Sequence, residues 1–171
     1  MKNKLSIIES PSEFFNELIE RIAIDNSISI SDALKFYLVS LLSDNMNPDN
    51  LLKKSDKHPY AGQPLSIIFN QAQMELENKK RQMLKYVGDY TLYVGGYFSD
   101  SLKKGIVNYS YYVSMGEDAF NHLSSISKQR HVADLYNDIF KNFVELLLLL
   151  KEAGSLTRTS ETELLNIKKK N

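Results

Sequence analysis

Hydrophobic positions recur at helical spacing through most of the chain. From about Ser12 to Asp25 the apolar residues fall three or four positions apart, which predicts an amphipathic helix with Ser10 or Ser12 as its N-cap. A second helix is expected after Ser31, with inward positions Leu34, Tyr37, Leu38, Leu41 and Leu42. Together these segments predict a hairpin of helices over residues 10–45.

Residues 45–64 interrupt this periodicity. They contain Pro48, Pro59, Gly62 and Pro64, with one helical turn expected at Asn50–Lys54. Loops longer than about 12–15 residues are uncommon in compact domains. The segment is therefore expected to be a mobile lid, a linker or a contact loop.

Three further long helices are expected after Pro64. The first runs to about Phe98, the second covers roughly 110–127, and the third covers roughly 128–153 with Gly154 as its C-terminal stop. The last of these is apolar nearly all round in its C-terminal half, which indicates burial in the bundle or contact with another chain. The residues proposed for an interface are Phe143, Leu146, Leu147 and Leu150.

The whole pattern predicts an all-α fold: a bundle of about five main helices with a short C-terminal helix. We expect a single helical domain over residues 1–171, with the main bundle at 65–154 and a polar tail at 155–171. Seven Gly and four Pro are too few for a turn-rich β architecture. The 43% hydrophobic content is ordinary for a globular domain.

Charge and cysteine content narrow the function classes. The 21 basic and 21 acidic side chains balance, so no basic excess indicates a nucleic-acid partner. The absence of Cys excludes disulfides, thiolate metal sites and Cys nucleophiles. The longest apolar run, Leu146–Leu150, is far short of the roughly 20 residues of a transmembrane helix. With no signal-peptide pattern at the start, a cytoplasmic location is expected.

The most unusual composition lies between Lys85 and Leu123. On a helix, Tyr86, Tyr90, Tyr93 and Tyr97 would share one stripe, while Gly88, Leu92 and Gly95 would form a nearly flat face. Such a face suits the close approach of a neighbouring backbone or a ligand, and the Gly95–Gly96 pair could also kink or end the helix. Residues 90–94 also fit a strand. We favour a helix because the flanking segments are strongly helical.

Asp89 lies inside this apolar segment, where a carboxylate must be paired or hydrogen-bonded. Lys85 and Tyr93, each one turn away, are the expected partners, and both a structural pair and a functional carboxylate stay open. Asp118 and His122 are also one turn apart, as an acid–base unit, half a metal site or a surface pair would be. No metal site is predicted, because no further ligands stand at diagnostic spacing.

Several of these elements resemble a family of uncharacterised bacterial helical proteins. The resemblance spans about residues 84–123 and rests on Tyr86-Val-Gly-Asp89, Gly96-Tyr-Phe98, Ser101-Leu102, Tyr111-Tyr112 and Met115-Gly116. It implies an all-helical fold with the aromatic segment at its centre, and it carries no activity and no site residue.

Two functions from different classes follow. The first is a non-enzymatic helical module that binds a protein partner or a second copy of itself; no common catalytic or nucleotide-binding motif is present, and no catalytic residue or cofactor is predicted. The alternative is a small-molecule-binding or catalytic bundle with a tyrosine-lined pocket between the third and fourth helices. Its expected ligand-binding residues are Asp89, Tyr90, Tyr93, Tyr97, Tyr112 and His122.

Overall fold

The computed structural model describes residues 10–102 and 108–169, with the side chains of 101, 102 and 162–169 left aside. Within that part of the chain every regular element is helical and none is a strand, which confirms the all-α prediction. In chain order the elements are α1 (Pro11–Asp25), α2 (Asp32–Asp44), α3 (Asp49–Leu52), α4 (Leu65–Gln73), α5 (Glu77–Leu92), the π-helical turn η1 (Tyr93–Tyr97), α6 (Ser99–Leu102), α7 (Tyr109–Ile126), α8 (Arg130–Lys141) and α9 (Phe143–Lys169).

The first two helices begin where their caps predict. The Ser10 side chain accepts from the Glu13 backbone N–H, and the Glu13 carboxylate accepts from the Ser10 backbone N–H, so α1 starts with a complete capping box. The Ser31 side chain accepts from the Leu34 N–H and caps α2 by this single hydrogen bond. The two helices pack against each other.

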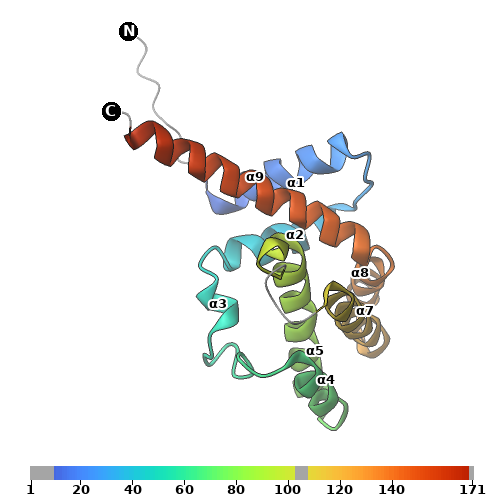
Figure 1. Ribbon diagram of the computed structural model, residues 1–171. Coiled ribbons are helices and arrows are strands. Elements are labelled where there is room, and N and C mark those ends of the chain that lie inside the picture. Colours follow the sequence, from blue (N-terminus) through green and yellow to red (C-terminus); the bar gives the residue numbers. More distant parts are fainter. Residues whose placement is uncertain (1–9, 103–107, 170–171) are drawn as a thin grey trace.

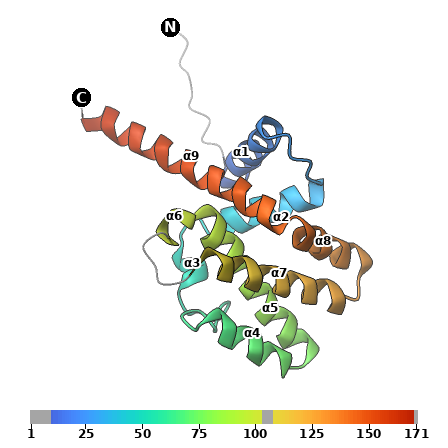
Figure 2. The ribbon, with the colours of Figure 1, turned by 45° about the vertical axis from the view of Figure 1, so that its right-hand side comes forward.

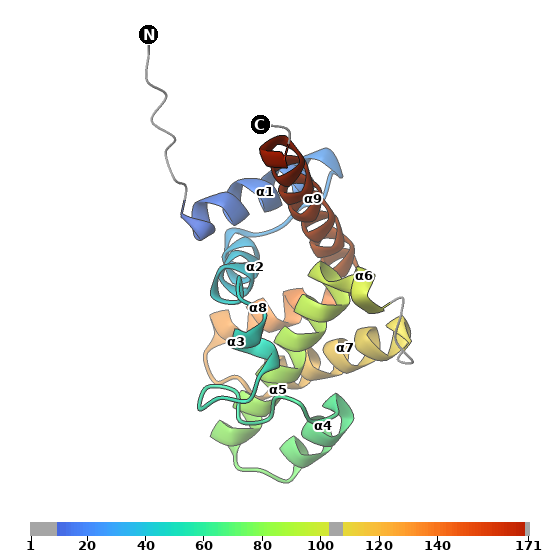
Figure 3. The ribbon, with the colours of Figure 1, turned by 60° about the vertical axis from the view of Figure 1, so that its left-hand side comes forward.

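The prediction of one long third helix is wrong. The chain turns at residues 74–76, so that α4 folds back on α5 (Figure 3). A continuous helix would carry Leu65, Ile68 and Ala72 away from the core, whereas the turn buries all three. The cost is two exposed apolar side chains at the turn, Met74 and Leu76, which are 90% and 86% exposed. Burial of the apolar face of α4 thus outweighs the helical continuity that sequence periodicity indicates.

The aromatic segment is helical, and not a strand, but its end is a π-helical turn. The Gly95–Gly96 pair lies inside η1, and the Phe98 N–H donates to the Tyr93 carbonyl, which closes the wider turn. A Cβ added to Gly96 would lie 2.8 Å from the Leu150 Cβ, so these glycines allow α9 to approach closely. The flat glycine face therefore receives neighbouring helices.

The predicted fifth helix is divided, and its predicted end is wrong. The chain bends at Asn142, between α8 and α9, and Gly154 does not stop α9, which continues to Lys169. The expected separate C-terminal helix is the last part of α9, and residues 170–171 of the predicted tail lie outside the described residues. Gly154 serves packing, because a Cβ there would overlap the Tyr97 carbonyl oxygen of η1.

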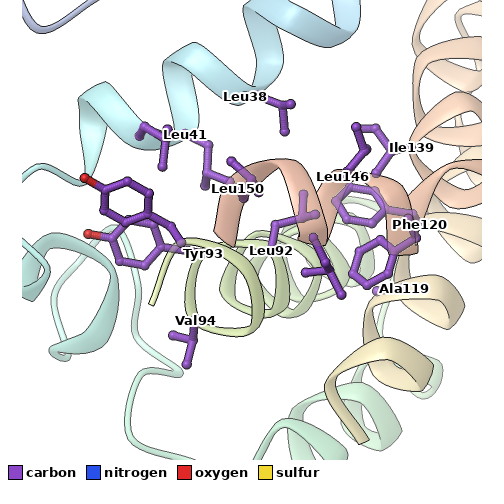
Figure 4. Packing of buried hydrophobic residues seen from close by; sticks show 14 of the residues in the cluster. Leu38, Leu41, Leu92, Tyr93, Val94, Ala119, Phe120, Ile139, Leu146 and Leu150 are labelled. Carbon is purple, nitrogen blue, oxygen red and sulfur yellow. The ribbon is translucent and has the colours of Figure 1, made fainter. Parts of the chain in front are cut away.

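The core joins helices that are far apart in the sequence. Figure 4 shows Leu38 and Leu41 of α2, Leu92 of α5, Phe120 of α7, Ile139 of α8 and Leu150 of α9 gathered around the α5–η1 segment. The central position of α5 is visible in Figure 1. α9 crosses one end of this core, in contact with α1 and η1, and its C-terminal part extends past the other helices (Figure 2). The arrangement leaves the face of α5 that carries Lys85 and Asp89 turned toward α2.

Candidate functional site

Asp89 is a buried carboxylate held by two donors from different helices. Its side chain is 11% exposed. One oxygen accepts from the Lys85 ammonium at 2.5 Å, as the one-turn spacing predicts. The other accepts from the phenol of Tyr37 on α2, and not from Tyr93 as expected. The three side chains therefore connect α2 to α5 through charge-assisted hydrogen bonds.

Within this cluster the pKa values of the Lys85 ammonium and the Tyr37 phenol are both raised. Burial alone would lower the pKa of the Lys85 ammonium, but the charge and hydrogen bond of Asp89 raise it above its ordinary value of 10.5. Burial, followed by the Asp89 charge, raises the pKa of the Tyr37 phenol well above 10.0. Near pH 7 the cluster thus consists of an ammonium, a carboxylate partner and a neutral phenol. The Lys85 Nζ also lies 5.0 Å from the centre of the Tyr37 ring, within cation–π range.

A cavity of about 630 Å³ opens beside this cluster. This volume falls within the range of about 300–1,000 Å³ that small-molecule sites occupy. It lies between α2, the connection from α3 to α4, and α5, with one residue from α8. Its lining comprises Ala33, Phe36, Tyr37, Ser40, Leu41, Asp44, Asn45, Leu51, Asp56, Lys57, His58, Pro59, Tyr60, Gln82, Lys85, Tyr86, Asp89 and Leu135. We call this cavity the Asp89 pocket.

The irregular stretch predicted at residues 45–64 supplies one wall of the Asp89 pocket. The His58 ring lies 5.3 Å from the Tyr86 ring, and the Tyr60 ring lies 6.3 Å from it. The segment is held in place by backbone hydrogen bonds between Ser55 and His58 and by the Tyr86 phenol, which donates to the Leu51 carbonyl. Of the roles considered for this stretch, a contact loop matches its place in the fold.

His58 is the one imidazole in the pocket lining. Partial burial, followed by the nearby Lys57 ammonium, lowers its pKa from the ordinary 6.5, although the Asp89 charge acts in the opposite direction. The ring is therefore mostly neutral near pH 7 and presents an uncharged aromatic surface with one donor and one acceptor.

Only Asp89, among the predicted ligand-binding residues, lines this pocket. The other tyrosines fill space between helices. Tyr90 stacks on Tyr112 between α5 and α7, with ring centres 6.4 Å apart. Tyr93 donates to the Asn45 carbonyl and stacks on Tyr97. Tyr90 and Tyr112 thus pack against each other between α5 and α7, whereas the Asp89 pocket lies on the α2 side of α5.

His122 also has a packing role. Its ring stacks on Phe69 of α4, with ring centres 5.3 Å apart, and its Nδ1 lies 3.4 Å from the Gln73 Nε2. These contacts with α4, and not an ion pair with Asp118, occupy the imidazole. Among the side chains that the structure describes, no group of three or more His, Asp or Glu residues is arranged to hold a metal ion.

The residues proposed for an interface lie inside the domain. Phe143, Leu146, Leu147 and Leu150 are each 1% exposed or less and pack in the chain's own core. On α9 the apolar surface that solvent reaches includes Val144 and Leu148, which are 45% and 56% exposed.

Sequence reasoning did not assign to a site the pocket aromatics Phe36, Tyr37, His58, Tyr60 and Tyr86. Tyr37 is separated from Asp89 by 52 positions, so no local spacing relates them. The sequence offered only an indirect indication of Tyr37. A tyrosine among the leucines of α2 places a phenol on a buried helix face, where its hydroxyl needs a hydrogen-bond partner.

No helix in the part of the chain that the structure describes is long and apolar enough to span a membrane. No protein-family model matches the chain, and comparison with curated proteins and with solved structures gives no match. The resemblance of residues 84–123 to uncharacterised bacterial helical proteins stays a prediction. Function must therefore be argued from the geometry of the Asp89 pocket.

Proposed function

We propose that this chain is a small-molecule-binding helical domain whose ligand occupies the Asp89 pocket. The observation that carries the proposal is the cavity of about 630 Å³ beside a buried, paired carboxylate. Aromatic and aliphatic walls with a few oriented polar groups are typical of ligand sites. The sequence also suggested a ligand pocket at Asp89, but between the third and fourth helices. The pocket proposed here lies on the α2 side of α5.

The polar cluster supports binding more than catalysis. Tyr37 and Lys85 both have raised pKa values, so neither is a ready proton acceptor near neutral pH. Asp89 is already engaged by two donors. The pocket therefore offers three fixed polar groups: the Asp89 carboxylate, the Lys85 ammonium with two further N–H donors, and the neutral His58 imidazole. Such groups orient a ligand without performing a reaction on it.

A fragment screen by ligand-observed NMR tests the proposal. Ala33 lies at the solvent-exposed edge of the pocket, so Ala33→Trp is expected to fill the mouth without disturbing the core. The matched control is Asn121→Trp on the exposed face of α7, outside the pocket lining. Fragments that bind the unmodified chain and the control, but not Ala33→Trp, support the proposal. Binding that is indifferent to Ala33→Trp, or no binding of any fragment, would contradict it.

Self-association is the second proposal, supported by the exposed Val144 and Leu148, which lie one turn apart on α9. Two adjacent apolar side chains on an outer helix face suit a helix-to-helix contact. Light scattering after size exclusion measures the mass directly. A dimer that Val144→Ser with Leu148→Ser converts to monomer supports the proposal, whereas a monomeric unmodified chain at high concentration overturns it.

A further inference from the structure

The aromatic rings of the Asp89 pocket form a surface suited to positive charge. Phe36, Tyr37, His58, Tyr60 and Tyr86 line it together. The faces of aromatic rings carry partial negative charge. Burial raises the pKa of the Tyr86 phenol above its ordinary value, so this ring is neutral near pH 7. Aromatic walls of this kind attract ammonium groups by cation–π interaction.

The charged side chains of the lining add to this preference. Three carboxylates, Asp44, Asp56 and Asp89, face two ammonium groups, Lys57 and Lys85, which leaves one net negative charge with His58 neutral. Asp89 is neutralised by Lys85. Asp44 and Asp56 are exposed at the mouth, and over the described residues neither has an ion-pair partner within 4.0 Å. Lys57 is also exposed and has no ion-pair partner among the described residues, so the unpaired charges of the lining sum to one negative charge.

Lys85 already places a cation in these surroundings. Its Nζ lies 2.5 Å from the Asp89 carboxylate and 5.0 Å from the centre of the Tyr37 ring. Burial would lower the pKa of this ammonium, but Asp89, with a further contribution from Asp44, raises it. The negative charges near Lys85 therefore outweigh the effect of burial and keep its ammonium protonated.

We infer that the ligand of the Asp89 pocket is a small organic cation, with an ammonium group held against the aromatic rings and near Asp44 and Asp56. This inference rests on the proposed function and names the chemical class of its ligand. The apolar part of such a molecule would contact the lining of Leu41, Leu51 and Leu135. The opposite class, an anion held by Lys57 and Lys85, would have to approach two unpaired carboxylates.

Three probes that share one aromatic body but differ in charge separate these classes: 2-phenylethylamine, 2-phenylethanol and 3-phenylpropionate. Their dissociation constants are measured by calorimetry or NMR at low ionic strength. We expect the amine to bind at least about tenfold more tightly than the alcohol, as a cation–π contact with added charge attraction implies. The carboxylate should bind most weakly. Raising the salt concentration should weaken the amine alone, since the mouth is exposed.

Two matched variants test whether the preference for the amine arises in the pocket. Asp44→Asn with Asp56→Asn should bring the amine within about twofold of the alcohol, since the charge attraction is lost while the rings remain. Asp118→Asn removes an exposed carboxylate of α7 outside the pocket and should change neither constant. Equal affinities, or tighter binding of 3-phenylpropionate, overturn the inference but leave the proposed function standing, provided that Ala33→Trp blocks the binding. If none of the probes and no screened fragment binds, both fail.

Discussion

The two faces of α5 and η1 show two uses of one helical segment. On one face, Gly88, Gly95 and Gly96 admit neighbouring helices so closely that an added Cβ at Gly88 would lie 2.7 Å from the Phe120 ring. On a neighbouring face, Lys85, Tyr86 and Asp89 border a cavity of about 630 Å³. Side chains of α7 and α9 pack closely against the glycine face. The carboxylate face keeps open space because α2 meets it through a polar cluster.

The difference shows which property of a helix face decides between core and site. Small residues let two helices interdigitate at the density of a protein interior, and no void remains. A buried carboxylate must be satisfied by specific donors, so the neighbouring helix is held where the hydrogen bonds require. Space left beside such a cluster is then available to a ligand.

The largest effect is expected where Gly154 of α9 packs against η1. Gly154→Ala places a Cβ against the Tyr97 carbonyl, a backbone atom that cannot rotate away, and should lower the free energy of unfolding by about 3 kcal/mol. Urea unfolding measures this change. An unpacked helical glycine would instead gain about 1 kcal/mol from the same substitution. Stabilisation of Gly154→Ala would therefore contradict the close contact.

Gly62→Ala is the control for this first prediction. Gly62 has φ +88° and no atom within 4 Å of an added Cβ. The substitution should cost about 1–2 kcal/mol through backbone strain alone. A larger loss in Gly62→Ala than in Gly154→Ala would reverse the expected order of packing and strain.

On the carboxylate side, Asp89→Asn should destabilise the fold by about 2 kcal/mol, because the buried Tyr37 phenol and the Lys85 ammonium both lose a charged acceptor. Lys85→Met should cost less than about 1 kcal/mol, since the lysine side chain is 47% exposed and its ion pair is screened. Unfolding of both single variants and the double variant gives the coupling. Equal losses in the two single variants would show that the pair, and not the Tyr37 contact, dominates.

Alkaline pH should lower the stabilisation that the Tyr37–Asp89–Lys85 cluster gives to the fold. The pKa values of Tyr37 and Lys85 lie above their ordinary values of 10.0 and 10.5 in the folded chain, so their contribution to stability is complete below pH 10 and is lost as the pH rises further. The unmodified chain should therefore lose stability more steeply above pH 10 than Tyr37→Phe does. Urea midpoints at pH 8 and above pH 10 test this. Parallel slopes in the two proteins would mean that the Tyr37 phenol is not buried against Asp89.

The smallest effect on stability is expected at the mouth of the pocket. Phe36 is 73% exposed, so Phe36→Ser should change the free energy of unfolding by less than about 0.5 kcal/mol. The same substitution should weaken ligand binding, since it removes one aromatic wall. Exposed Ile24 on α1, 71% exposed, gives the matched control Ile24→Ser, which should change neither quantity. A stability loss above 1 kcal/mol for Phe36→Ser would assign that ring to the fold and not to the pocket.

Local spacing was sufficient to predict the elements whose determinants are close in sequence. The Ser10 and Ser31 caps, the helical state of the aromatic segment and the Lys85–Asp89 pair all depend on residues within one turn of each other. The flat glycine face was also recognised correctly as a place of close approach. The breaks at residues 74–76 and at Asn142 were missed because they carry no Pro or Gly. They form because folding back buries more apolar surface.

The sequence by itself determined that this chain is helical, where its first two helices start, and that Asp89 needs a partner. Those properties follow from 3.6-residue periodicity, side-chain capping and the cost of burying a charge. Only the tertiary structure decided that Tyr37, 52 positions away, is the second partner, that Gly154 faces a carbonyl, and that the cavity opens toward α2. The physical reason is that these outcomes depend on which helix faces approach each other, and that choice is made by the packing of the whole core.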